Sequence, residues 1–171
     1  MEKVLIAYFS HAGENYVNGA MQHLSIGNTK VAAQMIQEIT QGDLFFIDTV
    51  NQYPDDHMEK INIAQKELDE QARPELKEYI NIEDYDTIFL CYPNWWSTCP
   101  MAVFTFLEEN DFSNKTILPL CTHEGSGLGH SVQDIQKSCP NSNVLNALAI
   151  QGYKVNQAKS IIEKWINENE E

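Results

Sequence analysis

Short apolar runs alternate with stretches of helical periodicity along almost the whole chain. The runs are rich in Ile, Leu, Val and Phe and do not alternate strictly with polar residues, as is typical of parallel strands covered on both faces. We expect five strands: Val4–Phe9, Leu44–Asp48, Thr87–Tyr92, Thr116–Cys121 and Val144–Gln151. Strands that alternate with helices predict an α/β fold, a three-layer, doubly wound, five-stranded parallel sheet with right-handed crossovers.

The segments between these runs carry apolar stripes at helical spacing. From Asn28 a stripe continues to Ile39, with Asn28 as the expected cap and Gly42 as the expected stop. Pro100 is expected in the first turn of the helix that precedes the fourth strand. A shorter helix is expected to end before Pro140.

Two further helical patterns complete the alternation. A stripe of Met58, Ile61, Ala64 and Leu68 is expected to form the crossover between the second and third strands. An amphipathic stripe from residue 155 to residue 166 predicts a terminal helix, with Trp165 in the core. No linker, repeat or low-complexity segment divides the chain, so we expect a single domain over residues 1–171.

Charge and cysteine content narrow the class of protein. Eleven basic against 25 acidic residues give a formal net charge of -14, which repels nucleic acid and anionic lipid. The sequence shows no secretory signal and no apolar window long enough for a membrane span, so we expect a cytoplasmic protein. The four cysteines lack C-x-x-C spacing and are expected to be reduced thiols, and the five histidines form no metal-binding pattern with them.

The turn after the first strand is the first candidate binding segment. Ser10 ends the strand, and Gly27, Asn28 and Thr29 open the helix that follows. Hydroxyls and free N–H groups at a helix N-terminus can hold a phosphate, although the same residues also serve as plain helix caps. The first strand-to-helix turn of such a sheet lies where ligands bind, which favours the phosphate interpretation.

The loop after the third strand holds two of the three tryptophans. Pro93, Asn94, Trp95 and Trp96 follow an apolar run. Adjacent indoles at a strand end favour a flat apolar ligand, and the amide of Asn94 offers hydrogen bonds to a heterocycle. The alternatives are that the indoles cap the core or meet a partner subunit. If a ligand binds, one indole is expected to touch it and the other to pack or shield.

The loop after the fourth strand is the third candidate. Its glycines allow close backbone approach to a ligand. The candidate binding residues are Thr122, His123, Glu124, Gly125, Ser126 and Gly127. The spacing matches neither a dinucleotide fingerprint nor a nucleophile elbow, and Cys121 at an apolar strand end favours a packed thiol. We therefore expect no catalytic side chain and no metal site.

Together these motifs resemble those of the flavodoxin family, in the same order and on the same elements. They are Ala7-Tyr8-Phe9-Ser10, Gly27-Asn28-Thr29, Tyr92-Pro93-Asn94-Trp95-Trp96 and Thr122–Gly129. The resemblance implies strand order 2-1-3-4-5 and non-covalent FMN. It implies that Ser10, Asn28 and Thr29 hold the phosphate, with Gly27 allowing close approach. It also implies that residues 93–96 line one side of the ring and residues 122–127 wrap its polar edge and the ribityl chain.

Residues 11–26 depart from the common family pattern, because they separate Ser10 from Gly27-Asn28-Thr29. A loop of this length is usually functional or mobile. It is expected to fold over the phosphate or ring, to contact a partner, or to hold a second subunit in a homodimer. The sequence leaves these alternatives open.

Bound FMN implies redox chemistry supplied by the cofactor. The leading expectation is an electron-transfer flavoprotein that passes electrons from a reductase to an acceptor, either a redox protein or a small molecule. A second is an FMN-dependent enzyme that reduces quinones or other small molecules with NAD(P)H. A third is a flavin-free interaction domain on the same fold, since fold alone does not fix function.

Overall fold

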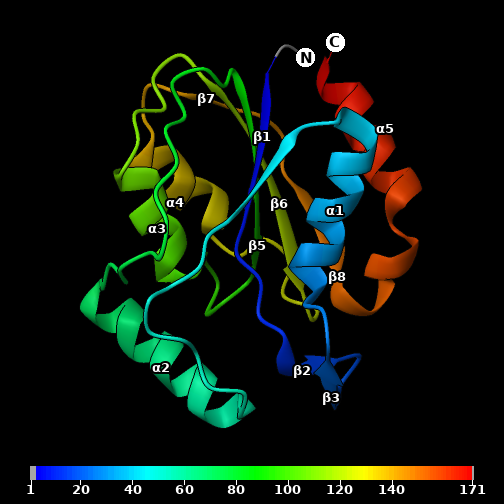
Figure 1. The fold of residues 1–171 in the computed structure, drawn as a ribbon. Coiled ribbons are helices and arrows are strands. Elements are labelled where there is room, and N and C mark those ends of the chain that lie inside the picture. The colour runs from blue at the N-terminus through cyan, green and yellow to red at the C-terminus, as the bar shows by residue number, and fades with distance from the viewer. Residues whose placement is uncertain (1–2, 171) are drawn as a thin grey trace.

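The computed structural model describes residues 3–170. Its main sheet is parallel and is flanked by helices (Figure 1). The sheet order is β4-β1-β5-β6-β7, with β8 also paired to β6. The strands are β1 (Val4–Tyr8), β4 (Asp43–Phe46), β5 (Thr87–Pro93), β6 (Thr116–His123), β7 (Asn143–Val144) and β8 (Leu148–Gln151). With β7 and β8 as two parts of a fifth strand, the predicted α/β fold and the order 2-1-3-4-5 are confirmed.

Helices cover both faces of this sheet (Figure 1). One face carries α1 (Asn28–Thr40) and α5 (Lys159–Glu170), and the other carries α3 (Met101–Glu108) and α4 (Ser131–Ser138). Residues of β1 divide between two cores: Leu5 and Ala7 pack with α3 and α4, while Val4 and Ile6 pack with α1 and α5. Burial on both faces explains why the strand sequences do not alternate.

The fifth predicted strand, Val144–Gln151, is broken in the structure. Its first part pairs Ile117 with Val144, whereas its second part pairs Leu120 with Leu148, so the register shifts by one residue between them. The carbonyl of Asn146, in the break, accepts a hydrogen bond of 2.7 Å from Nε1 of Trp165. The predicted core position of Trp165 is confirmed, and its indole nitrogen satisfies a backbone group that has left the ladder.

Three predicted helix boundaries are wrong by one residue or more. Gly27 caps α1 in place of Asn28, which is its first helical residue, and Gln41 in the left-handed conformation ends it, one residue before Gly42. Pro100 is the N-cap of α3 and lies just outside its first turn. The first turns of the predicted terminal helix form a separate 3-10 helix, η1 (Gly152–Gln157).

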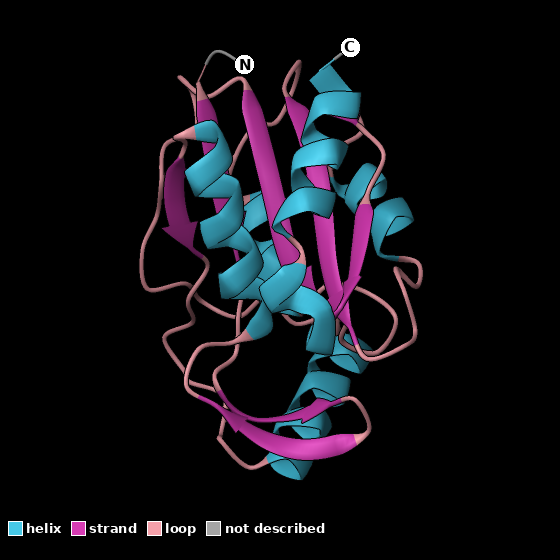
Figure 2. Ribbon diagram, turned by 90° about the vertical axis from the view of Figure 1, so that its right-hand side faces the viewer, coloured by secondary structure: helices cyan, strands magenta, loops and turns pink. Residues whose placement is uncertain are grey.

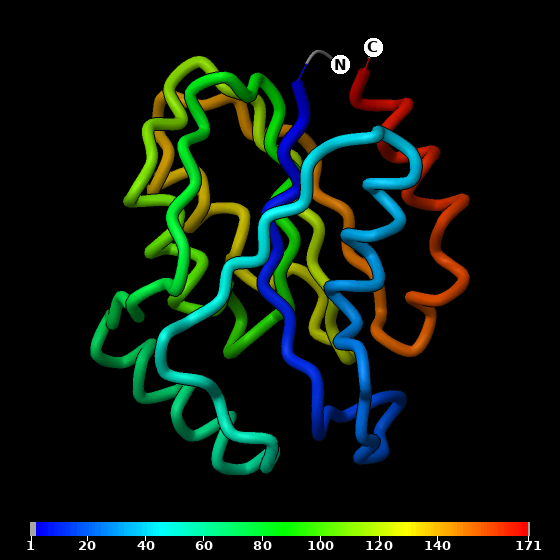
Figure 3. Tube along the Cα trace, viewed as in Figure 1, coloured from blue at the N-terminus to red at the C-terminus, as the bar shows by residue number. Residues whose placement is uncertain are grey.

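The insertion forms an antiparallel hairpin of β2 (Gly13–Val17) and β3 (Ala20–Leu24). Its turn contains Asn18 and Gly19, both with positive φ, the backbone that tight hairpins favour. Figure 2 shows the hairpin lying beyond the end of the sheet. Figure 3 shows that α2 (His57–Glu70), the helix of the crossover, lies at the same end, opposite both termini.

Two findings bear on the expectations from composition. All four cysteines are buried and unpaired, which agrees with reduced thiols. Within residues 3–170, no helix combines the length and apolar character needed to cross a bilayer.

Candidate functional site

A cavity of about 870 Å³, counting its part open to solvent, lies at the carboxyl ends of β1, β5 and β6. This is the edge at which open α/β sheets bind ligands. Of the residues predicted for a binding site, all line it except Gly27, Gly125 and Gly127. The predicted residues that line it are Ser10, Asn28, Thr29, Pro93, Asn94, Trp95, Trp96, Thr122, His123, Glu124 and Ser126. Three loops distant in sequence therefore meet in one site, as expected.

The turn between β1 and α1 has the form of an anion-binding site. Oγ of Ser10 accepts the N–H of Lys30 at 3.1 Å. Ser10 thereby supplies the capping hydrogen bond that the N-cap residue Gly27, having no side chain, does not make. The N–H groups of Asn28 and Thr29 precede the first intrahelical bond and point out of the helix end. A Cβ on Gly27 would collide with Oγ of Ser10 and lie 2.8 Å from the carbonyl of His11. Only glycine permits this compact turn.

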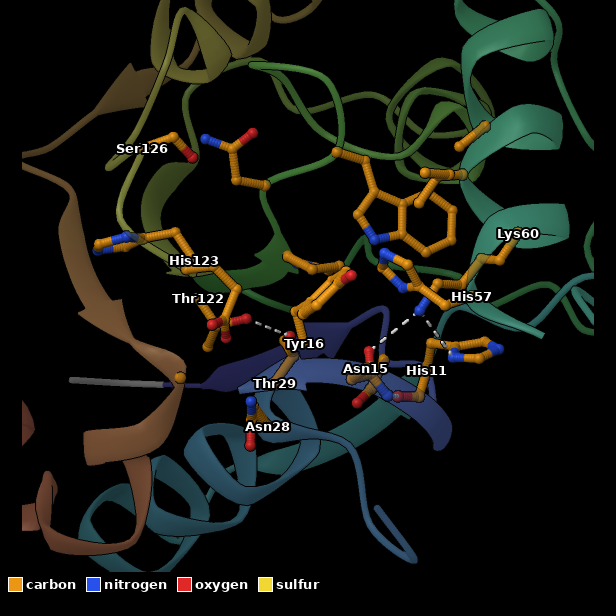
Figure 4. Close-up of a pocket in the computed structure, with 18 of the residues that line it drawn as sticks. His11, Asn15, Tyr16, Asn28, Thr29, His57, Lys60, Thr122, His123 and Ser126 are labelled. Carbon is orange, nitrogen blue, oxygen red and sulfur yellow. Dashed lines mark hydrogen bonds between the residues drawn. The ribbon is translucent and has the colours of Figure 1, made fainter. Parts of the chain in front are cut away.

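Thr29 also joins the turn to the end of β6. Its Oγ1 lies 2.8 Å from Oγ1 of Thr122, and both residues are almost fully buried (Figure 4). The hydroxyl pair fixes the first turn of α1 against the loop that follows β6. The cavity wall is thus continuous between these two segments.

The two adjacent indoles have different surroundings. Trp95 packs edge-on against the rings of Phe9 and Tyr53, with centroids 5.0 Å from each. Trp96 is 43% exposed, and its Nε1 donates to the carbonyl of Ile61 on α2 at 2.9 Å. Positive φ at Trp96, followed by another at Ser97, turns the chain so that the rings diverge. Both line the cavity, one anchored in the core and one at the mouth.

The amide of Asn94 is used within the protein. Its Nδ2 donates to the carbonyl of Gly127 at 2.8 Å, and its Oδ1 accepts the N–H of Ser97 at 2.9 Å. One amide N–H therefore joins the tryptophan loop to the loop after β6, and the amide oxygen closes a turn within the tryptophan loop. Gly125 and Gly127 in that second loop have φ values of 143° and 68°, which favour glycine.

The hairpin supplies a wall of the cavity that the sequence left open. His11, Asn15 and Tyr16 line it, and the ring of Tyr16 meets that of His57 edge-on at 4.6 Å. At the hairpin turn, the N–H of Asn18 donates to Oε2 of Glu124 at 3.0 Å. The hairpin is thereby held at α2 and at the loop after β6, so the insertion folds over the cavity.

Lys60 on α2 makes the tightest connection to the hairpin. Its side chain is buried, and Nζ donates to the carbonyl of Glu14 at 2.9 Å and to Oδ1 of Asn15 at 3.1 Å. Nδ1 of His11 lies 3.5 Å from the same nitrogen (Figure 4). Among the described residues that line the cavity, Lys60 is the only lysine or arginine.

Burial shifts the ionisation of this group. Burial, and then the charge of Lys60, lowers the pKa of His11 to about 4. Burial lowers the pKa of Lys60 to about 8, although the charge of Glu14 acts in the opposite direction. The pKa of His57 is lowered by burial and by Lys60, and burial raises that of Glu124. Near neutral pH the imidazoles are therefore uncharged and the ammonium carries the positive charge.

The sequence interpretation missed most residues on the α2 side. The expected stripe of this crossover helix placed Met58 inside, yet Met58 is 57% exposed and Lys60 is buried. The rest of the stripe faces inward, with Ala64 buried and Leu68 packed on the core, but at the start of α2 the inner face lines a polar cavity. The lining residues that were not predicted are His11, Asn15, Tyr16, His57, Lys60, Ile61, Ala64 and Gly152. Asn18-Gly19 was the available signal that the insertion forms a hairpin.

Two other chemistries receive no support. Burial raises the pKa of the Cys121 thiol to about 12, so it is not a thiolate nucleophile near neutral pH. Residues 3–170 contain no group of three or more His, Cys, Asp or Glu side chains placed to hold a metal ion.

Comparison with known proteins gives consistent results. The sequence profile of the flavodoxin family matches residues 3–169. A candidate flavoprotein from Bacteroides uniformis shares 26% identity and a TM-score of 0.79, covering 97% of this chain and 98% of its own. A Lactobacillus acidophilus flavoprotein solved with FMN shares 22% identity and a TM-score of 0.69, covering 96% of this chain and 99% of its own. No curated protein matches the sequence significantly.

Proposed function

Because this chain belongs to the flavodoxin family, we propose that it binds FMN in the cavity and transfers electrons from a reductase to an acceptor. The observation that carries the proposal is the meeting of a phosphate-type turn and an aromatic loop in one cavity. The FMN held by the Lactobacillus acidophilus protein of the same fold supports it. FMN supplies the redox chemistry, and the protein binds, orients and tunes it.

Different parts of the cavity bind different parts of FMN. The N–H groups of Asn28 and Thr29, with the hydroxyl of Ser10, receive the phosphate, and Gly27 lets it approach. Trp96 and Pro93 cover one side of the ring, while Trp95 holds their loop to the core through its contacts with Phe9 and Tyr53. The hairpin and α2 exclude water from the far side.

Further residues of the loop after β6 lie along the polar edge of the ligand. Glu124 and Ser126 line the cavity, and the imidazole of His123 accepts the N–H of Gly125 at 2.9 Å, which orders the loop. Gly152 lies against the side chains of Asn28 and Glu124, with which a Cβ there would collide. Its lack of a side chain lets these two residues of the site pack close to the backbone.

The direct test is the absorbance spectrum of purified protein and an FMN titration of the protein stripped of ligand. We expect flavin absorbance and saturable binding of one FMN per chain. Thr29→Val and Gly27→Ala should weaken FMN more than riboflavin, since both act at the phosphate turn. Absence of saturable FMN binding in the folded wild-type protein would overturn the proposal.

A second candidate is direct reduction of quinones or other small molecules with NAD(P)H. The observation that favours it is the cavity wall of Tyr16, His57 and Lys60, which places polar and aromatic groups beside the proposed ring site. Steady NAD(P)H oxidation with a quinone and no added reductase would support the enzyme. Turnover only with a separate reductase would support the carrier.

A further inference from the structure

Lys60 is a buried cation that forms no salt bridge within residues 3–170. Its side chain is 4% exposed. The hydrogen-bond acceptors around Nζ are a backbone carbonyl, an amide oxygen and a neutral imidazole nitrogen. Within the described part of the chain, Lys60 forms no salt bridge, whereas Lys77, Lys159 and Lys164 each do. Lys60 is also the only lysine among the described residues that is buried.

The surrounding groups neutralise the ammonium only in part. The charge of Glu14 raises the pKa of Lys60, but its carboxylate forms no salt bridge with Nζ, and its Oε2 instead accepts the N–H of His57 at 3.2 Å. The lowered pKa values of His11 and His57 favour neutral imidazoles, which cannot balance the positive charge of the ammonium. Hydrogen bonds to neutral oxygens stabilise a buried ammonium but, without a salt bridge, leave part of its charge uncompensated, which costs free energy. A bound anion in the cavity would provide the compensation.

The phosphate turn and the lysine belong to different walls of the cavity. In the view of Figure 4, Asn28 and Thr29 lie apart from the group formed by Lys60, His57 and His11. The turn already presents N–H groups for an anion and has no charged side chain among Ser10, Asn28 and Thr29. The lysine is therefore available to another part of the ligand.

We propose that Lys60 provides the counter-charge for the reduced flavin ring, so that the cavity binds reduced FMN more tightly than a neutral side chain would allow. This inference rests on the proposed function. Two electrons and one proton convert the neutral oxidised ring into an anion, and a fixed ammonium in a water-poor site stabilises that added charge. Lys60 offsets locally the effect of a strongly acidic protein, which disfavours an anionic ring.

The test compares dissociation constants of oxidised and reduced FMN for the wild type and for variants. Dithionite supplies the two electrons under anaerobic conditions, and solvent supplies the proton. Lys60→Gln keeps a hydrogen-bond donor but removes the charge, and Lys60→Met serves as a second variant if Lys60→Gln does not fold. Lys66→Gln is the matched control, because it removes the same charge from an exposed position of the same helix.

We expect Lys60→Gln to weaken reduced FMN about tenfold relative to oxidised FMN, a lowering of the two-electron potential of about 30 mV. Lys66→Gln should leave the ratio nearly unchanged. An unchanged ratio in both Lys60 variants would overturn the inference. Equal losses for the two redox states, with riboflavin binding unaffected, would assign Lys60 to the phosphate and also overturn it. Wild-type protein that binds neither form would instead refute the proposed function.

Discussion

The hydroxyl pair of Thr29 and Thr122 allows a quantitative test of how the site is held together. The two residues are 2% and 4% exposed, and their oxygens lie 2.8 Å apart. Thr29→Val preserves shape but leaves the hydroxyl of Thr122 buried without a partner, which costs about 1–3 kcal/mol. Thr122→Val should cost a similar amount. Removing both hydroxyls leaves no orphaned group, so the double variant should be about as stable as either single variant or more stable.

The measurement is urea unfolding of the FMN-free protein for the wild type, the two single variants and the double variant. Thermal midpoints should follow, with a loss of about 2–4 °C for each kcal/mol in a chain of this size. The informative quantity is the coupling between the two positions. Additive losses in the double variant would show that the hydroxyls do not depend on each other, and would refute the reasoning.

Three further predictions concern the turn, the hairpin and the indoles. Gly27→Ala should weaken FMN at least about tenfold, because its Cβ displaces the Ser10 hydroxyl; Lys66→Ala, at an exposed position of α2, is the control, and an equal loss there would contradict the steric argument. The pKa of His11 is lowered from 6.5 to about 4 in the folded protein. Between these pH values the imidazole is protonated in the unfolded chain but not in the folded one, so the free energy of unfolding falls as the pH drops from 6.5 to about 4. The loss should be about 1–2 kcal/mol for a half-buried group, and urea midpoints against pH should fall less steeply in His11→Asn. Trp95→Leu should cost about 2 kcal/mol of stability in urea unfolding by removing two aromatic contacts, whereas Trp96→Leu should mainly weaken FMN in a titration. A larger loss of stability in Trp96→Leu than in Trp95→Leu would contradict this assignment.

Much of the site was predictable because its determinants are local. Ser10 ends a buried strand, Gly27-Asn28-Thr29 opens a helix, and the tryptophan loop follows an apolar run. Parallel strands bring their carboxyl ends to one edge, so the loops after them must meet. The side-chain partners were not predictable in the same way. The amide of Asn94 joins its own loop to the loop after β6, and that choice depends on where Gly127, 33 residues away, lies in space.

The sequence by itself determined the α/β architecture, the strand order through family resemblance, and the three loops that line the cavity. The apolar runs and helical stripes encode these features within short windows. Only the tertiary structure decided that residues 11–26 fold over the cavity and that Lys60 is buried beneath them. The hairpin's register is local, but its docking on α2 depends on contacts between residues more than 40 positions apart. No periodicity in the sequence records such contacts, which is why the charged wall of the site appears only in three dimensions.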